Sequence, residues 1–309
     1  METFKIGICE PEDFSKKAIK MLESYAAVSL YDGGELSEFI KDKDAVFVRL
    51  RYQINDDLIK EASSLKYVCS PTTGLNHINI SKQDIEIVSL KGEYEFLSSI
   101  RATPEHVFGL SLALLRNYAH AFLKKENAVF NRDLYKGYEL FQNKIGIIGL
   151  GRVGRILEKY YTTFGADVGY YDIEEKVNTN AKKYNSMEEL ISNSNIIILA
   201  ANYTKENEAM LSEKEFAMMQ GKYFINAARG ELVNEADLLN RIKEDWFKGV
   251  AIDVFANETS GSIFLDDFLN LTTTKNIIIT PHIGGATYTS MERTEEFIAE
   301  KLIKRIVRS

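Results

Sequence analysis

One short stretch, residues 144–164, restricts the fold of this chain more than any other. It reads Lys-Ile-Gly-Ile-Ile-Gly-Leu-Gly-Arg-Val-Gly from Lys144, so that an apolar run over 145–149 leads into G-x-G-x-x-G and then into a helical pattern over 152–164. A side chain at Gly149 would block a tight turn, one at Gly151 would hold a pyrophosphate off the backbone amides, and one at Gly154 would push the helix from the sheet. The N-terminus of that helix attracts anions. The position of the glycines between a strand and a helix therefore predicts a dinucleotide-binding unit.

An acidic residue follows at the spacing that such a unit uses to bind ribose. Asp172 comes after a second strand-like run, 168–171, where its carboxylate can accept from both ribose hydroxyls of an adenosine. The next residues, Ile173-Glu174-Glu175, add acid rather than the arginine that neutralises a 2′-phosphate. The sequence therefore predicts NAD as the cofactor, in preference to NADP. Further contacts to it are expected from Arg152, Val153 and Ala227.

The region around these motifs has the pattern of a doubly wound parallel sheet. Most of its apolar runs are separated by helical patterns, and right-handed crossovers between such runs give an α/β Rossmann dinucleotide-binding domain. A helix with a wide apolar side is expected over 101–130, packing on more than one surface. The six expected strands are 145–149, 168–171, 196–200, 223–226, 249–253 and 277–280.

The first hundred residues form a second, smaller α/β pattern. Short runs separated by single helices imply parallel crossovers. Strands are expected at 4–9, 27–31, 45–48, 66–69 and 86–89, and helical stretches at 12–25, 35–41 and 56–63. The helical pattern over 290–308 is amphipathic as well.

Three strands of the larger pattern end in side chains that suit hydride transfer to a 2-oxo acid. Ligands of open α/β sheets bind beyond the carboxyl ends of the strands, where Arg229, Glu258 and His282 follow three successive runs. Arg229 can clamp a carboxylate through two parallel N–H···O bonds. His282 can exchange the hydroxyl proton, and Glu258 can orient its ring and favour the imidazolium. Asp253 is either an acceptor for the nicotinamide carboxamide or an exposed acid at the end of a strand.

Composition excludes several other classes. The 38 Lys and Arg against 45 Asp and Glu give a net charge of −7, which disfavours a nucleic-acid partner. Apolar runs such as 196–201 are far shorter than the ~20 residues of a membrane span, and the N-terminus has no basic leader, so a cytoplasmic protein is expected. Cys9 and Cys69 lie in apolar runs and are expected to be reduced core residues. The four histidines have no metal-ligand spacing, so no metal site is expected.

These motifs together resemble the D-isomer-specific 2-hydroxyacid dehydrogenase family, which includes phosphoglycerate dehydrogenase and glyoxylate reductase. The likeness spans nearly the whole chain and is densest over 143–286. It is carried by the glycine fingerprint, by Asn-Ala-Ala-Arg-Gly at 226–230, by Asp-Val-Phe at 253–255 leading to Glu258, and by Thr-Pro-His-Ile-Gly-Gly at 280–285.

The resemblance implies a domain plan and further site residues. A flavodoxin-like substrate-binding domain is expected over 1–98, completed by a helix over 288–309, beside an NAD-binding Rossmann domain over 99–287. Gly74 and Leu75 would hold the substrate carboxylate with backbone amides, and Arg49 and Arg51 lie where the distal end of the substrate is recognised. A homodimer through the NAD-binding domains, with the helix after Arg101 taking part, is also implied.

The chain departs from the family pattern at several positions. Thr259 stands where proline usually follows the glutamate, Asn202 stands where a proline often lines the cofactor cleft, and Asn76, His77 and Asn79 alter the substrate loop. Glu258 disfavours a formate dehydrogenase, which has glutamine there. A regulatory domain after Ser309 is not expected.

The sequence thus predicts an NAD-dependent D-2-hydroxyacid dehydrogenase whose small-molecule substrate is left open. Two alternatives remain: an NAD-sensing, corepressor-like binding protein without significant turnover, and a phosphite dehydrogenase in which Arg229 faces an inorganic anion.

Overall fold

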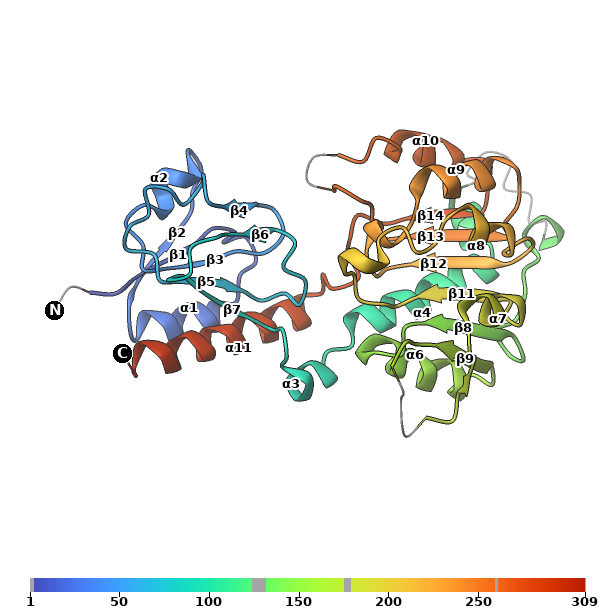
Figure 1. The fold of residues 1–309 in the computed structure, drawn as a ribbon, viewed down its shortest axis with the longest axis horizontal. Helices are drawn as coiled ribbons and strands as arrows, with labels where there is room; N and C mark the ends of the chain where they lie inside the picture. Colours follow the sequence, from blue (N-terminus) through green and yellow to red (C-terminus); the bar gives the residue numbers. More distant parts are fainter. Residues whose placement is uncertain (1–2, 124–131, 175–178, 259–260, 309) are drawn as a thin grey trace. The chain divides into compact units, whose positions relative to one another are not determined.

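The computed structural model describes residues 3–123, 132–174, 179–258 and 261–308. The chain divides into two compact units, the first formed by 1–100 together with 286–309, the second by 101–285 (Figure 1). The expected boundaries, after Ser98 and after Thr287, lie close to these. Each unit has a parallel sheet of its own.

The first unit is built on a five-stranded sheet in the order β2-β1-β3-β5-β7, the order typical of flavodoxin-like folds. All four strand pairs are parallel. Its elements are β1 (Lys5–Ile8), α1 (Lys16–Glu23), β2 (Ala27–Leu30), α2 (Leu36–Ile40), β3 (Ala45–Phe47), β4 (Ile54–Asn55), β5 (Tyr67–Ser70), β6 (Ile78–Asn79), β7 (Glu86–Ser89), α3 (Tyr94–Ser98) and α11 (Tyr288–Ile306).

The final helix of the chain completes this unit. In Figure 1, α11 runs alongside α1, and it also contacts β5 and β7. Ile298, Ala299 and Leu302 are fully buried in a core with β1 and β3. Thr287 caps this helix: its side chain accepts a hydrogen bond from the backbone N–H of Ser290 and so satisfies a first-turn donor.

The second unit is built on a seven-stranded sheet in the order β10-β9-β8-β11-β12-β13-β14. This is the strand order of a Rossmann domain with an added edge strand, and every pair is parallel. Its elements are α4 (Ala102–Leu115), α5 (Tyr118–Leu123), η1 (Arg132–Tyr135), β8 (Lys144–Ile148), α6 (Arg152–Thr163), β9 (Asp167–Tyr171), β10 (Lys182–Lys183), α7 (Met187–Ser192), β11 (Ile196–Leu199), η2 (Lys205–Asn207), α8 (Glu213–Ala217), β12 (Tyr223–Asn226), η3 (Gly230–Leu232), α9 (Glu235–Lys243), β13 (Gly249–Ile252), α10 (Leu265–Leu271) and β14 (Ile277–Ile279).

Buried side chains explain why the central strands are apolar at almost every position. All four residues of β11, β12 and β13 are buried, because helices cover both faces of the sheet. Two separate hydrophobic clusters result, and α4 closes one of them by packing on α6, β12, β13 and β14. The prediction that this helix packs on more than one surface is confirmed.

The expected helix over 101–130 is wrong in its length. Helix α4 stops at Leu115, and α5 begins at Tyr118. Between them Asn117 has φ of 53°, and its side chain donates to Lys136 O, while the amide of Tyr138 donates to Leu115 O. The segment 136–138 thus occupies the carbonyl of Leu115, which would otherwise accept the next hydrogen bond of the helix. The remainder of the expected helix, 124–131, lies outside the described residues.

One further expectation fails, and two short strand pairings were not expected. Residues 56–63 form turns rather than a helix, because the side chain of Asn55 accepts from the amide of Leu58 and the amides of Lys60 and Ala62 donate only three residues back. Strand β4 pairs with β6 in a two-stranded sheet that the sequence did not indicate. The edge strand β10 was missed as well, because its residues Lys182 and Lys183 are polar and exposed.

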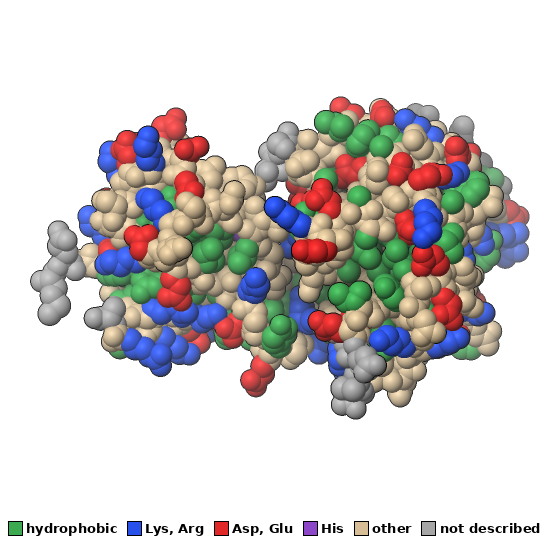
Figure 2. Space-filling view, in the orientation of Figure 1, with side chains coloured by type: hydrophobic (Ala, Val, Ile, Leu, Met, Phe, Trp, Pro, Cys, Tyr) green, Lys and Arg blue, Asp and Glu red, His purple; other side chains and the backbone are tan. Residues whose placement is uncertain are grey.

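The surface carries side chains of both charges, and the two cysteines are buried. On the face shown in Figure 2, Lys and Arg side chains lie among Asp and Glu on both units. Cys9 and Cys69 are buried free thiols, and burial raises the pKa of Cys9 to about 12. Among the described helices, none has the length and apolar character that a membrane span requires.

Candidate functional site

The glycine fingerprint forms the tight strand-to-helix connection that its spacing predicts. Gly149 directly follows β8 with φ of 94°, a conformation that favours glycine, and a Cβ there would lie 2.6 Å from the backbone of Ala201. A Cβ on Gly154 would lie 2.3 Å from Gly149 O. A Cβ on Gly151 would meet no atom within 4 Å, so open space lies over the first turn of α6. No side chain caps the first turn of α6. Because amides at a helix N-terminus bind anions, the open space here suits a pyrophosphate.

Asp172 lies beside this connection. Its Oδ2 accepts from the amide of Leu150 at 2.6 Å, and its Oδ1 accepts from the amide of Glu174 at 2.9 Å. The carboxylate is therefore fixed next to the glycines, where an adenosine ribose would follow the pyrophosphate. Ile173 is exposed, and Glu175 lies outside the described residues.

The other residues expected to contact the cofactor lie just after two strands of the same sheet, β8 and β12. Arg152 and Val153 are the first two residues of α6, and both are half-buried. Burial lowers the pKa of Arg152, and the charge of Arg101 lowers it further. Ala227 follows β12 and is also half-buried. Arg152 thus places a partly desolvated positive charge at a helix N-terminus, where it would favour an anion.

Asn226, the last residue of β12, closes the loop that follows and that carries Arg229. The buried side chain of Asn226 donates to Arg229 O at 3.0 Å and accepts from the amide of Ala228 at 3.0 Å. The guanidinium of Arg229 donates once within the loop, to Ala228 O at 2.7 Å. Arginine has five N–H donors in a planar fork, so the rest of the fork can serve a carboxylate.

Gly230 brings this loop against the loop after β13. A Cβ on Gly230 would lie 2.0 Å from the carbonyl carbon of Phe255 and 2.1 Å from the amide nitrogen of Ala256. The two backbones are therefore in direct contact. This contact explains why glycine follows Arg229, and it places Arg229 close in structure to the loop that carries Glu258.

Glu258 and His282 form a hydrogen-bonded pair. Nδ1 of His282 lies 2.5 Å from Oε2 of Glu258, and Oε1 of Glu258 accepts from the amide of Phe255 at 2.9 Å. The side chains of His282 and Glu258 are 28% and 34% exposed, so both remain open to small molecules. His282 and Asn257 have φ of 53° and 58°, in the left-handed region, which asparagine and histidine adopt more readily than most residues. Thr259 lies outside the described residues.

A second glutamate supports this loop. Glu235, the first residue of α9, accepts from the amide of Ala256 at 2.6 Å and from the hydroxyl of Ser262 at 2.8 Å. Burial raises the pKa of Glu235 despite these bonds. The loop of Glu258 is thus held from both sides, by Gly230 and by Glu235.

Asp253 is not an exposed acid, as one interpretation of its position had it. Its side chain is 1% exposed and accepts from the hydroxyl of Thr280 at 2.5 Å and from the amides of Ile283 and Gly284 at 2.9 Å. Burial raises its pKa, but the bonds from His106, Thr280 and the two amides outweigh burial, and the pKa is lowered. Asp253 therefore joins the end of β13 to the turn that carries His282.

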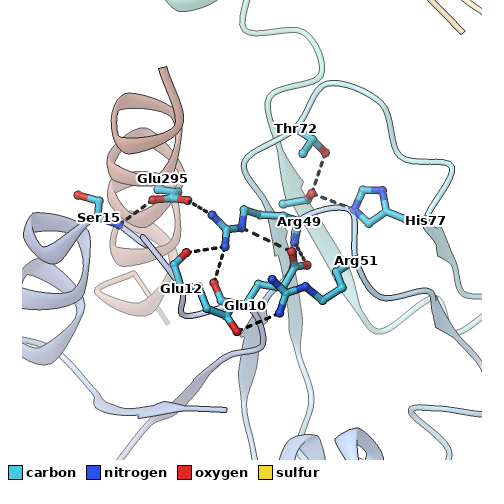
Figure 3. A network of polar contacts seen from close by, with 9 residues as sticks. Glu10, Glu12, Ser15, Arg49, Arg51, Thr72, His77 and Glu295 are labelled. Atoms are coloured by element: carbon cyan, nitrogen blue, oxygen red, sulfur yellow. Dashed lines mark hydrogen bonds and ion pairs between the residues drawn. The ribbon is translucent and has the colours of Figure 1, made fainter. Parts of the chain in front are cut away.

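Arg49 and Arg51, which were expected to recognise the distal end of the substrate, have different surroundings in the first unit. The guanidinium of Arg49 pairs with Glu10 at 3.5 Å and with Glu295 at 3.3 Å, and it donates to the carbonyls of Glu10 and Glu12 (Figure 3). Its side chain is 13% exposed. Arg49 is therefore already engaged by acidic side chains and carbonyls of its own unit. Arg51 is half exposed and pairs with Glu12 at 3.0 Å.

The loop of Gly74 and Leu75 is held by the polar side chains of Ser70, Thr72 and His77. The hydroxyl of Ser70 lies 3.1 Å from Nε2 of His77 and 2.8 Å from the hydroxyl of Thr72. The hydroxyl of Thr72 donates to Gly74 O at 2.8 Å. The amide of Ile78 donates to Leu75 O. With these carbonyls fixed, the orientation of the peptide groups in the loop is fixed as well.

Sequence reasoning missed His106, Glu235, Glu10 and Glu295. His106 had a detectable signal, a polar side chain within the apolar helix α4. Glu10 and Glu295 lie 285 positions apart and gave none. Among the described residues, no three His, Cys, Asp or Glu side chains are grouped to hold a metal ion.

Comparisons with known proteins agree with this geometry. The family model for the NAD binding domain of D-isomer specific 2-hydroxyacid dehydrogenases matches residues 108–284. A glyoxylate reductase of Pyrococcus furiosus is 28% identical, with 93% of this chain and 88% of the relative covered. A D-3-phosphoglycerate dehydrogenase of Haemophilus influenzae is 33% identical, with 88% and 66% covered. The crystal structure of a D-lactate dehydrogenase from Aquifex aeolicus, complexed with NAD and lactic acid, superposes with a TM-score of 0.84 at 25% identity and covers 98% of this chain and 95% of that chain.

Proposed function

Because the chain belongs to the D-isomer specific 2-hydroxyacid dehydrogenase family, we propose that it interconverts a small D-2-hydroxy acid and its 2-oxo acid with NAD(H). The observation that carries this proposal is the pair of His282 and Glu258, which lies at the carboxyl edge of the same sheet whose first strand leads into the glycine fingerprint. An acid/base side chain and a dinucleotide motif on one sheet are what an oxidoreductase of this kind requires.

His282 acts as the acid/base. Nδ1–H donates to the carboxylate of Glu258, which fixes the tautomer and leaves Nε2 to take the hydroxyl proton in oxidation and to return it in reduction. Glu258 stabilises the imidazolium that forms when Nε2 is protonated. Because Glu258 is itself held by the amide of Phe255, the ring orientation is fixed before a substrate binds.

Arg229 binds the substrate carboxylate. Its planar fork can make two parallel hydrogen bonds to a carboxylate and polarise the neighbouring 2-oxo group. The contact between Gly230 and Phe255 fixes Arg229 relative to the loop of Glu258.

The glycines, the N-terminus of α6 and Asp172 would hold the cofactor. Bound NAD(H) supplies or accepts the hydride. The carboxylate of Asp172, with Glu174 beside it, favours the ribose of NAD over the 2′-phosphate of NADP.

The amides of Gly74 and Leu75 in the first unit are proposed to bind a substrate carboxylate. Since the guanidinium of Arg49 already contacts Glu10, Glu295 and two carbonyls, we favour a 2-oxo acid without a second anionic group over a phosphorylated one. We also propose a homodimer, supported by the exposed apolar side chains of Phe122, Tyr138 and Phe141 in the second unit. Light scattering of the purified protein tests it.

The substrate is tested by oxidation of NADH with glyoxylate, pyruvate, hydroxypyruvate, 2-oxoglutarate and longer 2-oxo acids, and by reduction of NAD with phosphite. Turnover of an uncharged-tail 2-oxo acid is expected. Tight NADH binding without any turnover would instead support the sensor function, and turnover of phosphite alone would support the inorganic substrate.

The role of His282 is tested with His282→Ala. The variant should lose roughly 10²- to 10⁴-fold in turnover while its NADH affinity, measured by fluorescence titration, stays unchanged. Wild-type turnover in this variant would exclude His282 as the acid/base.

A further inference from the structure

Helix α4 carries His106, which contacts Asp253 and Thr280, two residues beside the turn of His282. Nε2 of His106 lies 3.2 Å from Oδ1 of Asp253 and 3.2 Å from Oγ1 of Thr280. The side chain of His106 is 18% exposed, and that of Asp253 is 1% exposed. One polar group of α4 thus reaches the residues at the ends of two neighbouring strands, β13 and β14.

The hydrogen-bond pattern assigns the proton on this ring. The hydroxyl of Thr280 has one proton, which it donates to Asp253 at 2.5 Å, a shorter contact than the one to His106. A carboxylate only accepts. Nε2 of His106 therefore carries a proton and donates it to Asp253.

Asp253 in turn determines the position of His282. The amide of His282 donates to Asp253 O at 2.8 Å and to Thr280 O at 3.0 Å, and the amides of Ile283 and Gly284 bind the carboxylate. His282 has φ of 53°, so its backbone depends on these bonds to stay in an uncommon conformation. A movement of the Asp253 carboxylate would therefore move the imidazole of His282.

The turn also lies directly on α4. A Cβ on Gly284 would lie 2.9 Å from Oδ2 of Asp253, 3.5 Å from Thr103 and 3.6 Å from Cδ2 of His106. No space separates the turn from the helix at this point. A displacement of the His106 ring would therefore move the turn by direct contact as well as through Asp253.

We propose that His106 is a positioning residue, whose Nε2–H holds Asp253 and Thr280 and so sets the ring of His282 against Glu258. The catalytic effect of His106 rests on the proposed function, whereas its effect on the position of the His282 ring can be observed without turnover.

The experiment compares His106→Leu, which removes the donor, with His106→Gln, which keeps an N–H at similar reach. His120→Leu is the matched control, because Nε2 of His120 also bonds outside its helix, to Lys275 O at 3.0 Å on another part of the unit. All variants are made in full-length protein labelled with ¹³C-histidine. The chain has four histidines, so the ring signal of His282 is assigned by its loss in His282→Asn.

The ring signal of His282 should shift or broaden in His106→Leu, return to its wild-type position in His106→Gln, and stay in place in His120→Leu. With a substrate found in the panel above, turnover of His106→Leu should fall roughly 10- to 100-fold with an unchanged KM for NADH, because a misplacement of about 1 Å can cost that much. An unchanged His282 signal in His106→Leu, or an equal shift in His120→Leu, would overturn the proposal.

Thr280→Val gives an independent test if His106→Leu does not fold. Valine keeps the shape of threonine but removes the hydroxyl that shares Oδ1 of Asp253 with His106. The same displacement of the His282 signal is expected, and its absence would count against the proposal. Because this signal is read without substrate, a lack of turnover in the wild-type protein would refute the proposed function and leave the positioning role to be decided by the spectra.

Discussion

Substitution of Gly230 by alanine should separate two loops that carry the proposed catalytic residues. The new Cβ would lie 2.0 Å from the carbonyl carbon of Phe255, where 3.0 Å is the closest that side-chain carbons approach. Both partners are backbone, so neither can rotate away, and one loop must move by about 1 Å. Overpacking of this kind costs about 1–3 kcal/mol of stability. A displacement of about 1 Å between Arg229 and the loop of Glu258 should lower kcat by roughly 100-fold.

The assay is steady-state oxidation of NADH with the best 2-oxo acid, together with thermal unfolding and NADH titration. NADH affinity should fall far less than kcat, because the glycine fingerprint and Asp172 lie elsewhere and only Ala227 shares the loop of Gly230. Gly109→Ala is the control: a Cβ there meets no atom within 4 Å, and alanine in a helix should raise stability by about 0.5–1 kcal/mol. The reasoning is refuted if Gly230→Ala matches the wild type in both Tm and kcat.

Three further changes test other parts of the structure. Arg229→Lys should reduce kcat/KM severely despite its retained charge, because an ammonium cannot reproduce the planar fork; unchanged kinetics would contradict carboxylate clamping. Asp172→Asn should raise the ratio of NADP to NAD turnover by roughly 10- to 100-fold, since a charge-assisted hydrogen bond to ribose is lost; equal use of both cofactors by the wild type would already exclude the assignment. Burial raises the pKa of Glu295 to about 7, although Ser15 and Arg49 lower it. A raised pKa in the folded state means that the folded protein binds the proton of Glu295 more tightly than the unfolded chain does. The stabilisation that results is complete below pH ~4.3 and is lost as pH rises towards 7. Glu295→Gln should remove up to ~3 kcal/mol of that pH dependence in denaturant unfolding between pH 5 and 8, and parallel curves for both proteins would disprove it.

The larger unit could be predicted from sequence because its signals are local. Each of its six expected strands is an apolar run bounded by a helix. Consecutive βαβ units place most consecutive strands side by side, except at the switch from β9 to β11, which lie on either side of β8. For that reason the ends of β12, β13 and β14, with Arg229, Glu258 and His282, could be assigned to one sheet edge from the residue pattern alone. The NAD-binding fold followed from glycines whose spacing has a direct geometric cause.

What escaped prediction depends on contacts between distant positions. The pairing of Arg49 with Glu295 joins residues 246 positions apart, and no local pattern marks it. An arginine at a strand end indicates an anion site equally well whether the anion is a ligand or a buried glutamate. The break after Leu115 was hidden for the same reason, since it is made by the approach of residues 136–138.

The placement of α11 has a consequence for biosynthesis. A ribosome makes residues 1–100 first, but Ile298, Ala299 and Leu302, which fill their core, emerge last. All of residues 101–285 are translated in between. We therefore expect the nascent N-terminal sheet to keep one face uncovered until residues 286–309 have been made, an interval in which its exposed apolar surface would be prone to aggregate or to bind chaperones.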